Sequence, residues 1–165
     1  ISVSTMYGLY YSLNAEKTLA ESKTIAYAVE SYQKDMNASI FTTLTNGLSA
    51  DDEDQFSFKA LVENTNIKAP YDTRWNGPYL NFKHYNFKDP YLDSSFRLVS
   101  LSNTLSTTCN NSKINRCYVF LKFKTILKNE CDNFEKVADS KGYGSVLRVD
   151  NTNDCDLYIK LTTEF

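Results

Sequence analysis

The chain has 165 residues, a formal net charge of −2 and a pI near 5.4, so it has the length of one domain and lacks the basic character of a general nucleic-acid binder. With 42% hydrophobic and 23% charged residues, its composition excludes wholesale disorder. His84 is the single histidine, which excludes a histidine metal cage within one chain. It has no G-x-S-x-G, glycine-rich phosphate loop or H-E-x-x-H beside it, so we expect a protein that is not an enzyme.

Residues 1–36 contain one glycine and no proline, and small or apolar residues recur every three or four positions. This spacing predicts one amphipathic helix of roughly 54 Å, at 1.5 Å per residue. Such a helix is longer than a domain of this size, and residues 1–13 carry no charge, so we expect its first turns to project. The alternative is an ordinary core helix that begins near Asn14.

Residues 37–94 form a polar connecting region that contains all three prolines. Within it, Trp75-Asn76-Gly77-Pro78-Tyr79-Leu80 is a turn signal with a bulky residue on each side. We interpret Trp75 as a packing anchor rather than a residue that stacks on a ligand. The acidic run 51–54 is interpreted as solvated, with a metal site as the alternative.

Residues 95–165 change to a period of two. Alternating apolar residues predict strands around 96–99, 119–123, 147–149 and 157–161. Their polar alternates favour an antiparallel sheet that is solvated on one face. The expected fold class is therefore α+β, with the long N-terminal helix packed on an antiparallel sheet of about four strands.

Four cysteines, Cys109, Cys117, Cys131 and Cys155, lie in the last part of the chain. Three pairings are open to them, and local spacing favours Cys109–Cys117 with Cys131–Cys155. The tight C-x2–4-C pairs that are typical of zinc sites are absent. Disulfides imply the periplasm or the cell exterior, whereas four reduced core thiols in a cytosolic protein are the alternative.

Two further features of this region suggest binding sites. Residues 150–156 carry oxygen side chains at nearly every position, as calcium loops do, although a solvated turn is the simpler interpretation. The candidate calcium ligands are Asp150, Asn151, Asp154 and Asp156. Residues 94–129 carry six basic residues and no acidic one, which suits contact with DNA or with an acidic neighbouring subunit. The candidate contact residues are Lys113, Arg116, Lys122, Lys124 and Lys128.

Three segments together resemble the type IV pilin superfamily: residues 75–80, Lys88-Asp89-Pro90-Tyr91, and the strand Phe96-Arg97-Leu98-Val99-Ser100. They look most like the major pseudopilins of type II secretion, in which W-x-G-P-Y-[LI] precedes K-D-P-W-G-N and a strand. Residues 25–35 resemble the end of that family's N-terminal helix. Tyr91-Leu92-Asp93 departs from the family's Trp-Gly-Asn. The cysteine-rich end is instead similar to the disulfide-bounded C-terminal region of type IV pilins.

The resemblance implies a structural subunit of a type IV filament, a pilus or a secretion pseudopilus, that assembles with itself and with other pilins or pseudopilins. It implies export, with inner-membrane anchoring by an apolar helix segment of roughly 20 residues before Ile1, then a periplasmic or extracellular filament. Trp75, Pro78, Tyr79 and Pro90 would be structural anchors, and a calcium ion in a late loop gains support. The alternatives are a minor pilin or surface adhesin that binds DNA or a surface ligand, and a secreted enzyme.

Overall fold

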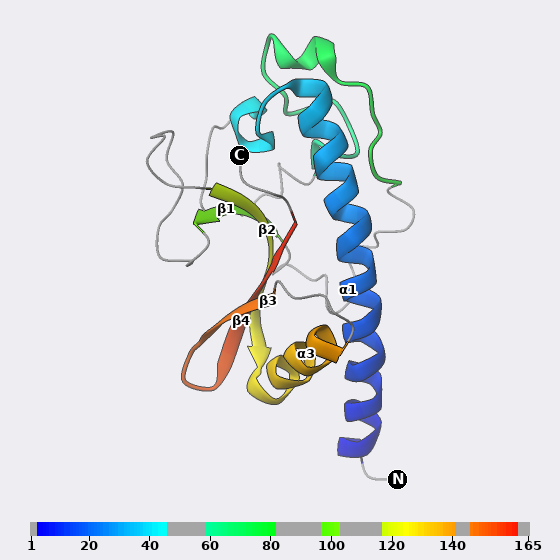
Figure 1. Cartoon of the computed structure of the whole chain (residues 1–165), viewed down its shortest axis with the longest axis vertical. Coiled ribbons are helices and arrows are strands. Elements are labelled where there is room, and N and C mark those ends of the chain that lie inside the picture. Colours follow the sequence, from blue (N-terminus) through cyan, green and yellow to red (C-terminus); the bar gives the residue numbers. More distant parts are fainter. Residues whose placement is uncertain (1–2, 46–58, 82–96, 103–116, 141–145, 162–165) are drawn as a thin grey trace.

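The computed structural model describes residues 3–45, 59–81, 97–102, 117–140 and 146–161, with the side chains of its first helix described from Ala15 onward. Figure 1 shows a long helix standing beside a small sheet, with a second helix between them at one end. The elements in chain order are helix α1 (Val3–Met36), the 3-10 helices η1 (Ile40–Thr43) and η2 (Tyr71–Arg74), strands β1 (Arg97–Ser102) and β2 (Cys117–Leu127), helix α3 (Lys128–Ser140), and strands β3 (Val146–Asp150) and β4 (Asp154–Lys160).

One side of α1 is buried at the three-and-four spacing that the sequence predicts. Among the described side chains this stripe is at most 1% exposed at Ala15, Leu19, Ile25, Val29, Tyr32 and Met36. The helix begins at Val3 and not near Asn14. Its N-terminal turns extend beyond α3 and the sheet, as expected for a helix longer than its domain (Figure 1).

The C-terminal end of α1 is closed by its own backbone. Asn37 adopts a left-handed conformation with a φ of 50°, which asparagine tolerates better than most residues. Its N–H donates to the Lys34 carbonyl at 3.3 Å, and the N–H of Ala38 donates to the Gln33 carbonyl at 3.3 Å. These two bonds form a Schellman motif, which satisfies carbonyls that a helix end leaves without partners. The chain therefore turns sharply away from the helix axis after Met36.

The four strands form one antiparallel sheet in the order β1-β2-β4-β3. On its core face, Val119 and Leu121 of β2 lie beside Leu157 and Ile159 of β4. The β2–β4 register shifts by one residue between Phe123 and Ile126, which marks a β-bulge. The bulge reverses the alternation, so that Ile126 is buried in the same core while the next residue, Leu127, is 55% exposed.

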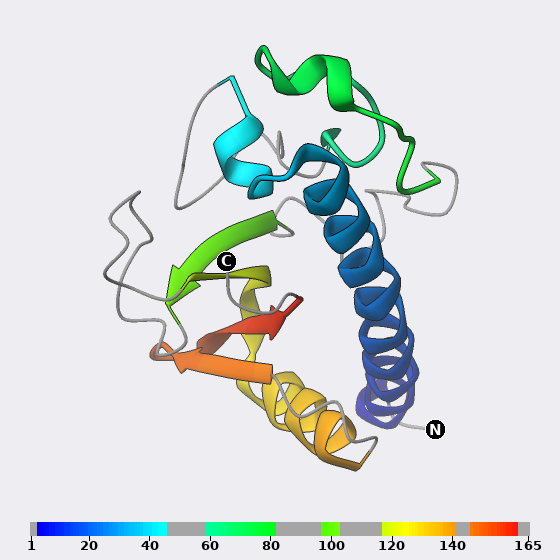
Figure 2. The same ribbon diagram turned by 45° about the horizontal axis from the view of Figure 1, so that its top comes forward.

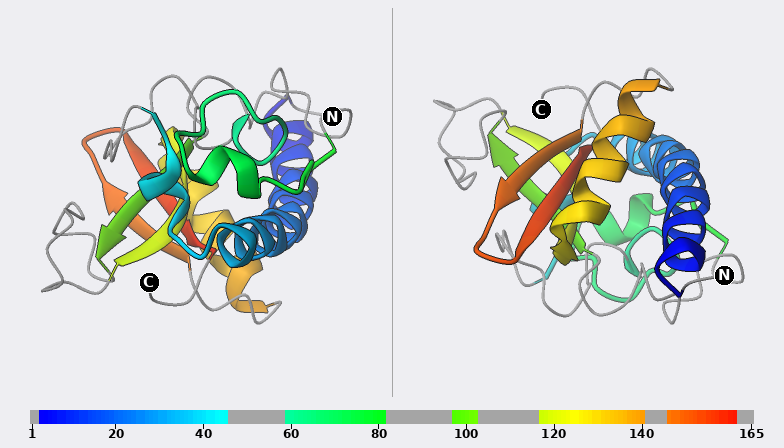
Figure 3. Two further views of the ribbon diagram at one scale, coloured as in Figure 1. Left: turned by 90° about the horizontal axis from the view of Figure 1, so that it is seen from above. Right: turned by 90° about the horizontal axis from the view of Figure 1, so that it is seen from below.

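The period-two pattern of residues 95–165 does not predict helix α3. Its buried residues Cys131, Phe134, Val137 and Ala138 join the core that also contains the α1 stripe. Among the described elements, α1 packs most closely on α3. The long helix therefore packs mainly on α3, which corrects the expectation that it packs directly on the sheet. Figure 2 and the right-hand view in Figure 3, seen from below, show α3 reaching from the sheet to the flank of α1.

The expectation of one solvated sheet face is wrong. Tyr118, Phe120 and Tyr158 lie on the face opposite the main core, and they are 8%, 0% and 7% exposed. Leu147 of β3 packs against this second cluster, whereas its neighbour Val146 packs against the main core. The sheet is therefore buried on both faces around its two central strands.

A disulfide between Cys131 and Cys155 joins α3 to the start of β4, as predicted, with their Cα atoms 6.6 Å apart. Both residues are fully buried. The predicted Cys109–Cys117 pairing involves Cys109, which lies outside the described residues.

Removing the buried disulfide should lower the stability of the fold. Replacing Cys131 and Cys155 together by alanine should lower the free energy of unfolding by about 3 kcal/mol, because the unfolded chain is no longer closed into a loop. Urea denaturation of the wild-type protein and the double variant measures the difference. Peptide mapping without reduction should recover the linked pair, and free thiols at both positions would contradict the assignment.

Candidate functional site

The segment from Trp75 to Leu80 is fixed against the end of α1 by aromatic contacts. The indole N–H of Trp75 donates to the Ala60 carbonyl at 2.8 Å. The ring of Tyr79 meets the rings of Trp75 and Tyr32 edge to face, with centroids 5.9 Å and 5.4 Å apart. Such edge-to-face pairs add to the stability that burial alone provides. Trp75 and Tyr79 therefore pack against each other, and Tyr79 also packs against Tyr32 of α1.

The other two predicted anchors have a different status. Pro78 lies exposed at the turn, and Pro90 lies outside the described residues. Gly77 matters for a steric reason, because a Cβ atom there would lie 2.5 Å from Cζ2 of Trp75 and 2.8 Å from Cδ2 of Tyr79. Only glycine lets both rings close over the turn.

Polar contacts join the same segment to the last turn of α1. The Tyr79 hydroxyl donates to the Asp35 carboxylate at 2.8 Å and accepts from the Asn76 N–H at 3.1 Å. Arg74 donates from Nη1 to the carbonyl of Met36 at 3.0 Å, which adds a cation at the negative end of the helix dipole. Burial, with a smaller contribution from Asp35, raises the pKa of Tyr79 to about 12.

One buried hydroxyl pair lies beneath these contacts. The Thr43 hydroxyl donates to the Ile40 carbonyl at 2.6 Å, so the Tyr32 hydroxyl must be the donor in its own 2.6 Å bond to Thr43. Burial raises the pKa of Tyr32, although the bond to Thr43 acts in the opposite direction. The end of α1 is thus held from η1 on one side and from the Trp75 segment on the other.

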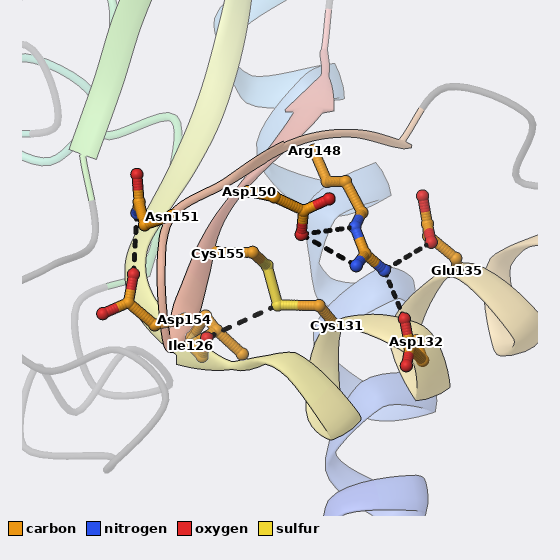
Figure 4. A network of polar contacts seen from close by, with 9 residues as sticks. All are labelled: Ile126, Cys131, Asp132, Glu135, Arg148, Asp150, Asn151, Asp154 and Cys155. Carbon is orange, nitrogen blue, oxygen red and sulfur yellow. Dashed lines mark hydrogen bonds and ion pairs between the residues drawn. A yellow bond between two sulfur atoms is a disulfide. The ribbon is translucent and has the colours of Figure 1, made fainter.

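A second polar cluster surrounds Arg148 at the opposite end of the sheet (Figure 4). Its Nη1 atom pairs with Asp132 and, at 2.9 Å, with Glu135, both on α3. Its Nε and Nη2 atoms donate to Oδ1 of Asp150 at 3.1 Å and 2.8 Å. The carboxylates of Asp132 and Asp150 are the main cause of a raised pKa for Arg148. Arg148 therefore joins β3 to α3 beside the disulfide. The signal for it in the sequence is an arginine two residues after Val146, at a strand position that faces the core.

The candidate calcium loop is a tight β3–β4 connection whose side chains bind one another. Asp150 pairs with Arg148, and Asn151 donates from Nδ2 to Oδ1 of Asp154 at 2.7 Å. Asp156 is partly buried on β4. Within the described parts of the chain, no three Asp, Glu, His or Cys side chains are grouped so that they could hold a metal ion. The calcium expectation gains no support from these residues.

Of the five candidate basic residues, the structure describes the side chains of Lys122 and Lys128. Lys122 is 9% exposed and lies over the Tyr158 ring at 5.4 Å, which corrects its expected role as a surface contact. The physical reason is that strand alternation turns it toward the covered second face. Lys128 is exposed at the start of α3, and Lys124 lies in β2 at the bulge. Outside the described residues lie Lys113, Arg116, the acidic run 51–54 and His84.

Comparison of the chain with protein-family models, with curated proteins and with solved structures finds no match. None of the helices formed by the described residues is both long enough and apolar enough to cross a membrane.

The Gly77 contact predicts a local steric effect. Gly77→Ala should lower the free energy of unfolding by about 1–3 kcal/mol, because the new methyl group overlaps the rings of Trp75 and Tyr79. Asn76→Ala is the matched control, since Asn76 is exposed and donates to the Tyr79 hydroxyl from its backbone N–H, which the substitution keeps. The control should change stability by no more than about 0.5 kcal/mol. Equal stability of the two variants in urea denaturation would contradict the close ring contact.

The raised pKa of Tyr79 predicts a loss of stability in alkali. The folded chain keeps the phenolic proton up to about pH 12, whereas the unfolded chain loses it near 10.0. The contribution is therefore complete below 10.0 and is lost as the pH rises through about 12. Across that range the stability advantage of the wild-type protein over Tyr79→Phe should shrink in urea denaturation. An advantage that stays constant or grows would contradict the assignment.

Proposed function

We propose that this protein is a structural subunit of a type IV filament, a pilus or a secretion pseudopilus, which acts by self-assembly and not by catalytic turnover. The observation that carries the proposal is the division of α1 into two parts. From Ala15 to Met36 the helix is buried along one side. Before that, it continues as a helix through an uncharged stretch that extends beyond the rest of the domain (Figure 1).

The head of the molecule suits a rigid building block. The end of α1 is held by Tyr32, Arg74 and Tyr79, and the far end of the sheet is held by the disulfide and by Arg148. A subunit that is repeated along a filament needs a fixed angle between its helix and its head, because errors in that angle accumulate with each copy. The contacts at the end of α1, together with the disulfide and the ion pairs of Arg148, supply such a fixed angle.

Two further observations support the proposal. The Trp75–Leu80 segment, by which the sequence resembles pseudopilins, is the segment that fixes the end of α1. The Cys131–Cys155 disulfide supports an exported protein, since such bonds persist in oxidising compartments. The alternative of a minor pilin that binds DNA is less favoured, because Lys122 is turned into the covered face of the sheet.

The proposal predicts that the uncharged stretch is the main association element. In cells that carry the gene, deletion of the gene should abolish either the filaments seen in electron micrographs or protein secretion. The wild-type gene should restore the lost function. Leu9→Glu should fail to restore assembly, because a charge in an apolar helix contact cannot be solvated. Asn129→Glu is the matched control, since it adds the same charge to the exposed first turn of α3. It should restore assembly fully.

Two results would contradict the proposal. The first is a deletion strain in which filaments, motility, secretion and DNA uptake are all normal. The second is Leu9→Glu assembling as well as the control. Loss of a hydrolytic activity in His84→Ala would instead favour the enzyme alternative.

A further inference from the structure

Strand β3 forms an outer edge of the sheet, because among the described strands it pairs with β4 alone. In Figure 2 it is the outermost strand of the β3–β4 hairpin, drawn in orange. The N–H of Asn151 donates to the Asp154 carbonyl at 2.8 Å, which fixes the phase of the ladder. Backbone groups alternate in direction along an antiparallel strand, so those of Leu147 and Val149 point to β4 and those of Arg148 and Asp150 point outward.

The outward edge of β3 combines free backbone groups with an apolar side chain. No described residue forms a hydrogen bond with the outward N–H and carbonyl groups of Arg148 and Asp150. Val149 lies between them, and its side chain is 42% exposed. An edge of this kind is a template for pairing with a strand of another chain.

The sequence of β3 matches itself when a second copy lies antiparallel to it. A two-fold axis at Val149 brings Val149 beside its own copy and places Arg148 opposite Asp150 of the second chain. Each of the two Arg148–Asp150 pairs is of the hydrogen-bonded type, so it exchanges both backbone bonds. The two Val149 side chains form a pair of the other type, in which side chains lie closest together.

Neighbouring registers lose this match. An axis at Arg148 sets two guanidinium groups opposite each other, and an axis at Asp150 does the same with two carboxylates. Like charges that lie directly opposite destabilise a sheet. An axis at Leu147 pairs Arg148 with Val146 and leaves Asp150 without a cross-strand cation. The charge pattern of the edge therefore selects the register centred on Val149.

Carboxylates of α3 limit the strength of such a contact. Asp132 and Glu135 on α3, together with Asp150, place three carboxylates around the guanidinium of Arg148 in each copy. A two-fold axis through the sheet puts both α3 helices on the same face, so the excess negative charges of the two copies repel each other. The edge is also short. We therefore expect a weak dimer that forms at high protein concentration.

We propose that β3 pairs antiparallel with β3 of a second copy of this chain, about a two-fold axis at Val149, and joins the two sheets into one. The contact uses the same edge of both copies, so it yields a closed dimer and not a longer chain of subunits. It is separate from the filament assembly proposed above and does not depend on it.

Disulfide crosslinking of the purified chain tests the contact. In the proposed register the Cα atoms of the two copies of residue 149 lie about 4.5 Å apart, within the span of a disulfide. Val149→Cys should therefore form a covalent dimer under mild oxidation roughly tenfold faster than the control Tyr27→Cys, because pairing holds its thiols at a high effective concentration. Tyr27 is 70% exposed on α1, so random collision favours the control. Equal rates, or a faster control, would overturn the proposal.

A charge reversal in the same crosslinking assay tests the register. Asp150→Lys, added to Val149→Cys, sets a lysine opposite Arg148 of the second copy and should reduce the rate to that of the Tyr27→Cys control. Asp139→Lys is the matched addition, since it makes the same charge change at an exposed position of α3. It should leave the rate of Val149→Cys within about twofold. Equal rates for the two additions would show that the register is wrong.

Sedimentation equilibrium tests the contact without an introduced thiol. The wild-type chain should show a reversible monomer–dimer equilibrium up to about 1 mM, a concentration at which weak contacts are populated. Val149→Lys should abolish the dimer, because it sets two ammonium groups side by side. Tyr27→Lys, which places the same residue at an exposed position of α1, should retain it. A wild-type chain that is monomeric throughout this range would overturn the proposal and leave the filament function untouched.

Discussion

Helix α1 is buried along one side only, and the rest of the structure is arranged around that side. Its stripe from Ala15 to Met36 enters one core with α3 and the central strands of the sheet. Burial of this length of apolar surface gives the helix a stability that its intrinsic propensity could not supply. The opposite side remains in water, and the first turns lie beyond the domain. Among the described residues, the helix therefore both supports the core and presents an exposed side.

Two groups of contacts fix the position of this helix relative to the sheet, and they differ in chemistry. At the end of α1, aromatic rings and hydrogen bonds from the Trp75 segment restrain the last turn. At the other end of the sheet, a buried disulfide and the ion pairs of Arg148 fix α3, on which α1 packs. The disulfide is covalent and dry, whereas the carboxylates around Arg148 are partly exposed, so salt weakens only the ion pairs.

The sequence predicts those parts of the fold where a single period persists. The long stripe of α1 and the alternation in β2 and β4 are strong because many residues repeat the same spacing. The sequence does not predict helix α3, because six of its 13 residues are charged. Its buried positions also include Cys131, whose spacing indicates a disulfide rather than a core position. Its signal was present in the spacing of Phe134, Val137 and Ala138, which is helical.

Other features could not be predicted because they depend on tertiary contacts. The polar alternates of β2 indicated a solvated face, yet aromatic residues among them, Tyr118 and Phe120, are buried in a second cluster. The bulge before Ile126 has no local signature, although it decides which residues of β2 reach the core. At the candidate site, the turn motif predicts Trp75 as a packing anchor. The bond from Arg74 to the Met36 carbonyl and the bond from Tyr79 to Asp35 have no such signal, because they form only where the chain folds back on α1.

The central claim is that α1 is an association element as well as a core helix. Cryo-electron microscopy of filaments isolated from cells that produce the tagged protein tests it most directly. The account predicts copies of this chain in the filament, with their α1 helices parallel and side by side and their sheets on the outside. Filaments that lack the chain, while the tagged protein is recovered as a free monomer, would contradict the account.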